Sequence, residues 1–182
     1  RYCYPLEKGV AKVISELWNG PDALLRDIER YLQGEAPSLK QVFPDEETLQ
    51  QRHDAIIHAI DKLKARWREC VKDIAALIEQ SAIDRRKFNR KNQDNWLGIV
   101  QAWAESPTEN YAFPEALTRF SQSFLNSRTK PDGQPPMHAL FSDIDVFLSQ
   151  PLTLRDLVIA RALSAVRYAV AEEKRRRGEL GF

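Results

Sequence analysis

The feature that most constrains the fold is a periodic stripe of apolar residues within positions 45–79. Its members are Leu49, Ile56, Ile60, Leu63, Trp67, Cys70, Ile74 and Leu77. After a first step of seven, the intervals alternate between four and three residues, the spacing of a coiled-coil-like seam on one helix face. At about 1.5 Å per residue, a helix over 45–79 would be a rod of roughly 50 Å. We expect this rod to form an arm, because a helix of that length projects beyond a compact domain unless another helix lies back along it.

The first turn of that helix is expected to hold three acids, because the helix dipole favours negative charge there. They are Asp45, Glu46 and Glu47.

The remaining sequence also favours helices. Seven glycines in 182 residues leave few of the tight turns that β-hairpins need, and no stretch shows sustained apolar–polar alternation. We therefore predict an all-α, irregular multi-helix fold forming a single domain over 1–182. The other expected helices cover 7–18, 22–32, 93–105, 138–148 and a re-entry helix at 154–177, with one more starting at Pro114. Thr153 is the expected N-cap of the last helix, Gly178 its end, 34–44 a linker and 128–136 a mobile loop.

Several classes of function are excluded by what the sequence lacks. Phosphate-cradling glycine loops and nucleophile elbows are absent, and no nucleophile, base and oxyanion donor can be assembled, so we expect no catalytic residue. Cys3 and Cys70 lack metal-ligand spacing, the three histidines are expected to be surface or boundary residues, and no metal site is predicted. No apolar run is long enough to cross a bilayer, and a reducing, cytoplasmic setting follows from the two cysteines.

Positive charge is concentrated in the middle of the chain. Residues 51–100 carry 11 Lys and Arg against 7 Asp and Glu, a net charge of +4, whereas residues 1–50 carry 6 against 9. Five cations fall within seven residues: Arg85, Arg86, Lys87, Arg90 and Lys91. They lie near an expected helix start, where the dipole does not favour cations, so we interpret them as candidate contacts to a nucleic-acid backbone. A short basic run is also a common surface feature.

Two further expectations concern the same surface. Arg86 and Arg90, four apart, are expected on one helical face. The tryptophans and phenylalanines fall at helical spacing and are assigned to the core rather than to a platform on which bases stack.

A second basic cluster closes the last helix and is also a candidate DNA contact. It consists of Lys174, Arg175, Arg176 and Arg177. Its simpler interpretation is that cations at a helix C-terminus complement the dipole. The only methionine is Met137 and the chain opens at Arg1, so we expect it to be a piece of a longer protein.

Several segments together resemble one family. They are Glu173 to Phe182 (EKRRRGELGF), 23–28 (ALLRDI), 31–37 (YLQGEAP), 83–90 (IDRRKFNR), 120–122 (FSQ) and 154–159 (LRDLVI). In this order they resemble the exodeoxyribonuclease V beta-subunit (RecB) family of UvrD-like superfamily 1 DNA helicases. The resemblance spans nearly the whole chain and does not depend on one short motif.

The resemblance implies that the chain is the helical insertion, called 1B, of the first motor domain. Its role would be to position duplex DNA ahead of an ATP- and Mg²⁺-dependent helicase–nuclease in bacterial double-strand break repair and recombination. The partners implied are double-stranded DNA and the gamma and alpha subunits (RecC and RecD), with no membrane. The family's ATP-binding and nuclease motifs are absent here, so the fragment itself is expected to have no activity. The alternative is a helical scaffold that mainly packs against those subunits.

Overall fold

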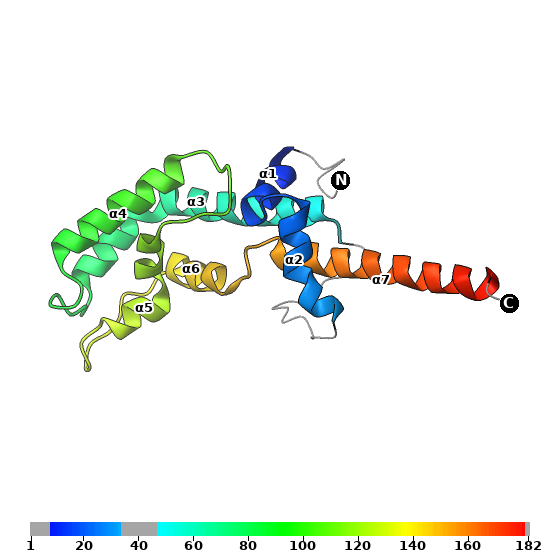
Figure 1. Ribbon diagram of the computed structural model, residues 1–182. Helices are drawn as coiled ribbons and strands as arrows, with labels where there is room; N and C mark the ends of the chain where they lie inside the picture. The colour runs from blue at the N-terminus through cyan, green and yellow to red at the C-terminus, as the bar shows by residue number, and fades with distance from the viewer. Residues whose placement is uncertain (1–7, 34–46, 181–182) are drawn as a thin grey trace. The chain divides into compact units, whose positions relative to one another are not determined.

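The computed structural model describes residues 8–33 and 47–180, and helices are its regular elements (Figure 1). They are α1 (Lys8–Leu17), α2 (Pro21–Leu32), α3 (Leu49–Gln80), α4 (Arg90–Glu105), the 3₁₀ helix η1 (Glu115–Phe120), α5 (Gln122–Ser127), α6 (Ala139–Ser149) and α7 (Arg155–Leu180). Extended pairing within these ranges is limited to one isolated bridge between Ile83 and Thr129. The all-α prediction is therefore confirmed. No helix among the described residues has both the length and the apolar character that a bilayer crossing requires.

Some predictions fall on residues that the structure does not describe. They concern Cys3, the linker at 34–44, and Asp45 and Glu46.

The described residues divide into two compact units. Among them, unit 1 comprises residues 8–33, 47–54 and 153–180, and unit 2 comprises residues 55–152. The expectations of a single domain and of a projecting arm stay predictions.

In unit 2 the apolar seam of α3 is buried as the spacing predicts. Ile56, Ile60, Leu63, Trp67 and Ile74 are each at most 5% exposed, whereas the predicted seam residue Cys70 is half-buried. At the end of the helix the seam moves from the predicted Leu77, which is half-buried, to a fully buried residue, Ile78. A straight helix with 3.6 residues per turn drifts from a strict 3.5-residue repeat, so the buried stripe shifts by one position after several turns.

The helix that lies back along α3 is α4, which runs antiparallel to it (Figure 1). Glu79 near the end of α3 binds Arg90 at the start of α4, and the Trp67 indole donates to Gln101 at 3.0 Å. Further along, the Lys64 ammonium donates to the Ser106 carbonyl at 3.0 Å. Along these contacts the residue numbers decrease on α3 while they increase on α4, so the two helices are antiparallel.

The start of α3 was predicted four residues too early. Glu47 and Thr48 are not helical, so Glu47 precedes the first turn instead of lying in it. The Thr48 hydroxyl accepts from the Gln51 backbone N–H at 3.1 Å, and the Gln51 side chain accepts from the Thr48 N–H at 2.9 Å. This reciprocal capping box begins the helix at Leu49.

The segment after Pro114 is broken into two short helices instead of one. The break is at Ser121, whose hydroxyl caps α5 by accepting from the Phe124 N–H at 3.2 Å. Just before the break, Phe120 packs against the seam of α3. Its ring contacts the Trp67 ring edge-on, and the two ring centroids are 5.1 Å apart.

Residues 128–136, expected to be a mobile loop, are attached to the end of α3 by backbone hydrogen bonds. The Asp84 N–H donates to the Arg128 carbonyl at 2.7 Å, and the Lys130 N–H donates to the Ala82 carbonyl at 3.0 Å. At Gly133 the backbones come so close that an added Cβ would lie 2.3 Å from the Ala82 Cβ. Only glycine allows this approach.

Unit 1 is built from α1, α2, the start of α3 and α7. Asp27 of α2 accepts from the Trp18 indole and from the Arg155 guanidinium, each at 3.2 Å. The predicted N-cap, Thr153, lies one residue too early, because α7 begins at Arg155 and the Leu154 carbonyl accepts the first helical hydrogen bond, from the Val158 N–H at 2.9 Å. The Thr153 hydroxyl still accepts from the Arg155 N–H at 3.0 Å. The prediction that Gly178 ends this helix is wrong, because α7 continues to Leu180. One glycine weakens a helix by only about 1 kcal/mol and does not terminate it.

Candidate nucleic-acid interface

The basic run at 85–91 forms the connection between α3 and α4 in unit 2. Residues 85–88 make a turn, and Asn89 caps α4 by accepting from the Asn92 N–H at 2.8 Å. Arg90 and Lys91 are therefore the first two residues of α4. As expected from the sequence, both cations lie at the positive end of a helix dipole, which does not favour them.

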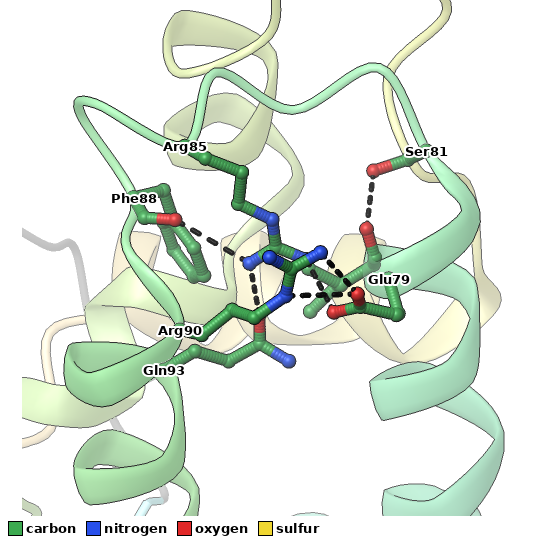
Figure 2. A network of polar contacts seen from close by, with 7 residues as sticks. Glu79, Ser81, Arg85, Phe88, Arg90 and Gln93 are labelled. Atoms are coloured by element: carbon green, nitrogen blue, oxygen red, sulfur yellow. Dashed lines mark hydrogen bonds and ion pairs between the residues drawn. The ribbon is translucent and has the colours of Figure 1, made fainter.

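Two of the five cations are ion-paired to one carboxylate near the end of α3. Figure 2 shows the Arg85 and Arg90 guanidinium groups converging on Glu79. Arg85 lies 2.8 Å from one Glu79 oxygen, and Arg90 donates to the other from two nitrogens at 2.6 and 2.9 Å. The hydrogen bond from Arg90 and the charges of both arginines hold the pKa of Glu79 below its usual value. The same ion pair raises the pKa of Arg90.

Arg85 has a further structural role. Its guanidinium donates to the Gln93 side-chain oxygen at 2.7 Å and to the Phe88 carbonyl at 3.4 Å (Figure 2). Its side chain is 24% exposed, compared with 68% for Arg90. Arg85 therefore ties the turn to both helices, and its donors are largely used.

The outward-facing cations of the run are Arg86, Lys87 and Lys91. The side chain of Arg86 is 91% exposed, and among the described residues it forms a single ion pair, a long contact of 3.4 Å to Asp84. Hydrogen bonds from Arg86, above all from its backbone N–H, hold the pKa of Asp84 below its usual value. The side chains of Lys87 and Lys91 are exposed, and within the part of the chain that the structure describes their ammonium groups form no hydrogen bond or ion pair.

The expectation that Arg86 and Arg90 share a helical face is wrong. Arg86 lies in the turn, whereas Arg90 begins α4 and is bound to Glu79. The capping geometry of Asn89 separates them, because an N-cap residue has extended backbone and interrupts the helical spacing.

Four residues that the sequence argument did not single out lie beside this run. The guanidinium carbons of Arg119 and Arg128 lie over the Phe124 ring, 4.9 and 4.6 Å from its centroid, and Arg119 also lies 5.5 Å from the Trp96 centroid. The assignment of aromatic residues to the core holds for Trp67, Phe88, Phe120 and Phe141, which are fully buried. Trp96 and Phe124 are half-buried. Their arginine partners are isolated in sequence, so no local pattern marks them.

The second basic cluster is on the last turns of α7, in unit 1. Its four cations are exposed, and two are paired along the helix: Arg175 with Glu172 at 2.5 Å and Arg177 with Glu173 at 3.0 Å. Position at a helix C-terminus agrees with the dipole interpretation. Whether any of the nine candidate cations contacts DNA stays a prediction.

The side-chain types that commonly ligate metals are dispersed over the described ranges 8–33 and 47–180. Within them no three His, Cys, Asp or Glu side chains come together in a way that could hold a metal ion.

The chain is similar over all of its 182 residues to the RecBCD enzyme subunit RecB. Identity is 57% with RecB of Escherichia coli (strain K12), 29% with RecB of Buchnera aphidicola subsp. Schizaphis graminum and 22% with that of Buchnera aphidicola subsp. Acyrthosiphon pisum. In each case the chain spans only 15% of the relative's length. No family model matches the chain. The predicted resemblance to RecB is confirmed, and the assignment to the helical 1B insertion stays a prediction.

Proposed function

We propose, from its similarity to a segment of RecB, that this chain is a DNA-contacting accessory region that positions duplex DNA for a RecBCD-type enzyme. The observation that carries the proposal is the set of three outward-facing cations, Arg86, Lys87 and Lys91. They are exposed cations on a turn and a helix start, and cations bind any phosphate whatever the base. We therefore expect binding through phosphates and without sequence preference.

The proposal extends to the enzyme of which the chain would form a part. In the family that it resembles, that enzyme is an ATP- and Mg²⁺-dependent helicase–nuclease of double-strand break repair and recombination in the bacterial cytoplasm. Its RecB subunit works with RecC and RecD, and the present chain would be the 1B insertion. The chain alone would neither hydrolyse ATP nor cut DNA, and DNA-stimulated ATP turnover by the purified chain would contradict this.

The test measures how tightly the full 182-residue chain binds a labelled 20-bp duplex. Binding is monitored by the fluorescence anisotropy of the duplex over a series of KCl concentrations. Each phosphate contact contributes about −0.9 to the slope of log Kobs against log salt, equivalent to about eightfold in affinity at 0.1 M salt. Lys87→Gln with Lys91→Gln should therefore flatten the slope by about 1.8 and weaken binding by roughly 60-fold.

The matched control removes two positive charges from the other cluster, with Arg176→Gln and Arg177→Gln. We expect this variant to change the slope by less than half as much. If the Arg176 and Arg177 pair is decisive and the Lys87 and Lys91 pair is without effect, DNA runs past α7 and the assignment of the site is wrong.

The second candidate function is a helical scaffold that packs against the partner subunits. It is supported by two large residues on α7, Tyr168 and Val170, which are 70% and 48% exposed. Co-purification with the gamma and alpha subunits distinguishes the two functions. Tyr168→Asp should abolish co-purification and preserve duplex binding if α7 is the scaffold surface, whereas unchanged co-purification would count against this candidate.

A further inference from the structure

Two arginines that are far from any run of charges in the sequence, Arg119 and Arg128, lie over the same half-buried ring, that of Phe124. We call Phe124, Arg119 and Arg128 the Phe124 clamp. Because each guanidinium carbon lies within 5 Å of the same ring centroid, the two are within about 10 Å of each other, comparable with the Debye length in physiological salt. Two like charges this close repel, and an anion bound beside them would relieve the repulsion.

The clamp contains little negative charge of its own. Arg119 donates to Glu115 at 3.2 Å, but that carboxylate is 83% exposed and its pairing is weakened by water and salt. The Arg128 guanidinium forms no hydrogen bond or ion pair with the described residues, and its contact is the Phe124 ring 4.6 Å away. A guanidinium stacked on a ring is oriented by that ring and keeps its N–H donors free at its edge.

The clamp adjoins the basic turn. The Arg128 carbonyl accepts from the N–H of Asp84, the residue just before the basic run, at 2.7 Å. The neighbouring residues Ile83 and Thr129 form an isolated β-bridge, so the two segments lie side by side. The ring of Phe88, within the run, lies 6.4 Å from the ring of Phe124. Cations from separate parts of the chain therefore gather at one end of unit 2.

We propose that the Phe124 clamp binds a phosphate of the nucleic-acid backbone next to the turn that carries Arg86 and Lys87, an inference that rests on the proposed function. The planar edge of Arg128 suits two phosphate oxygens at once. The ligand is a phosphate and not an unstacked base, because both guanidinium groups already lie over the ring on which a base would stack. Arg128 is the principal contact, and Phe124 positions it.

The test uses the full 182-residue chain and the same labelled 20-bp duplex. Arg128→Gln should flatten the salt slope by about 0.9 and weaken binding about eightfold at 0.1 M salt. Arg128→Lys keeps the charge and loses the planar fork, so the slope should be retained and the affinity should fall. Phe124→Leu keeps the net charge, and its affinity should fall because Arg128 loses its platform. Circular dichroism of each variant checks that helicity is unchanged.

The matched control is Lys62→Gln, which removes one positive charge from an exposed position on α3. Lys62 lies 17 residues before Glu79, roughly 25 Å along the helix axis, and this variant should bind within twofold of wild type. A purely structural Arg128 would change helicity or melting temperature and leave the slope at the wild-type value, which would overturn the clamp.

The outcomes separate the clamp from the proposed function. If Lys87→Gln with Lys91→Gln weakens binding and Arg128→Gln does not, the clamp is wrong and the proposed site stands. If only Arg128→Gln weakens binding, the clamp stands and the site proposed on the turn is wrong. A wild-type chain that does not bind the duplex, or that binds it unaffected by either variant, overturns both.

Discussion

Glu79 restrains the basic turn, so removing its charge should strengthen DNA binding while weakening the fold. Its carboxylate neutralises one charge of the Arg85 and Arg90 pair and orients both guanidinium groups toward α3. Glu79→Gln keeps the size of the side chain and removes the charge. Most substitutions that disturb a fold also weaken its binding, so opposite signs for stability and affinity are a specific signature of this arrangement.

The magnitude follows from what still holds each arginine after the change. Arg85 remains bound to the Gln93 side chain at 2.7 Å and to the Phe88 carbonyl, so it stays in place. Arg90, which is 68% exposed and held by Glu79, is released. One further cation then becomes available to phosphate. The slope of log Kobs against log salt should steepen by about 0.9, and affinity should rise by up to about eightfold at 0.1 M salt.

The assay is the same KCl series of duplex-binding curves, together with thermal melting of the free chain. The matched control is Glu69→Gln, an exposed carboxylate ten residues earlier on α3, roughly 15 Å away along the axis. It changes net charge equally without releasing an arginine. An unchanged slope in Glu79→Gln would refute the release of Arg90. An equal steepening in both variants would show that net charge alone governs binding.

Three further predictions concern the fold. Leu63→Ala, at a position 5% exposed in the α3 seam, should lower the free energy of unfolding by roughly 2–5 kcal/mol in urea titrations, and a loss under about 0.5 kcal/mol would place Leu63 outside the core. Gly133→Ala should destabilise by about 1–3 kcal/mol because its Cβ would meet that of Ala82, whereas Gly98→Ala, with nothing within 4 Å, should stabilise by up to about 1 kcal/mol; equal effects would contradict the close approach. Because the folded-state pKa of Glu79 is lowered, its stabilisation is present above the ordinary value of 4.5 and is lost as pH falls through the lower folded value. The difference in melting temperature between wild type and Glu79→Gln should therefore shrink below pH 4.5, and a constant difference down to the acid limit would contradict the ion pairs.

Periodicity predicted the long helix and most of its buried face, because a seam of apolar residues has few other ways to be buried. The ends of the helices were harder to predict, since they depend on side-chain hydrogen bonds. The start of α3 nonetheless has a local signal, because Thr48 and Gln51 have the spacing of a capping box. The preceding acids are also typical of a helix start, and they favour a position that is too early. The break at Ser121 depends on where Phe120 packs, and that is tertiary information.

The candidate site was predicted as a position along the chain but not as a set of available charges. A count of five cations treats them as equivalent, whereas Glu79, six residues before Arg85 and eleven before Arg90, binds two of them. Helical spacing does not relate these positions, because the chain reverses between α3 and α4. No local sequence pattern predicts the Phe124 clamp. Arg119 and Arg128 both lie over the Phe124 ring only because η1 and α5 pack together in the fold.

The two cations that begin α4 differ in a way that bears on function. Both lie at the positive end of the helix dipole, which disfavours them. For Arg90 the Glu79 carboxylate offsets that disadvantage, so the fold itself accounts for the residue. Lys91 has no such partner among the described residues and is exposed. A cation that the local electrostatics disfavour, and that no contact compensates, is better explained by a negatively charged ligand than by stability. Lys91 is therefore a stronger indication of a phosphate surface than the length of the basic run.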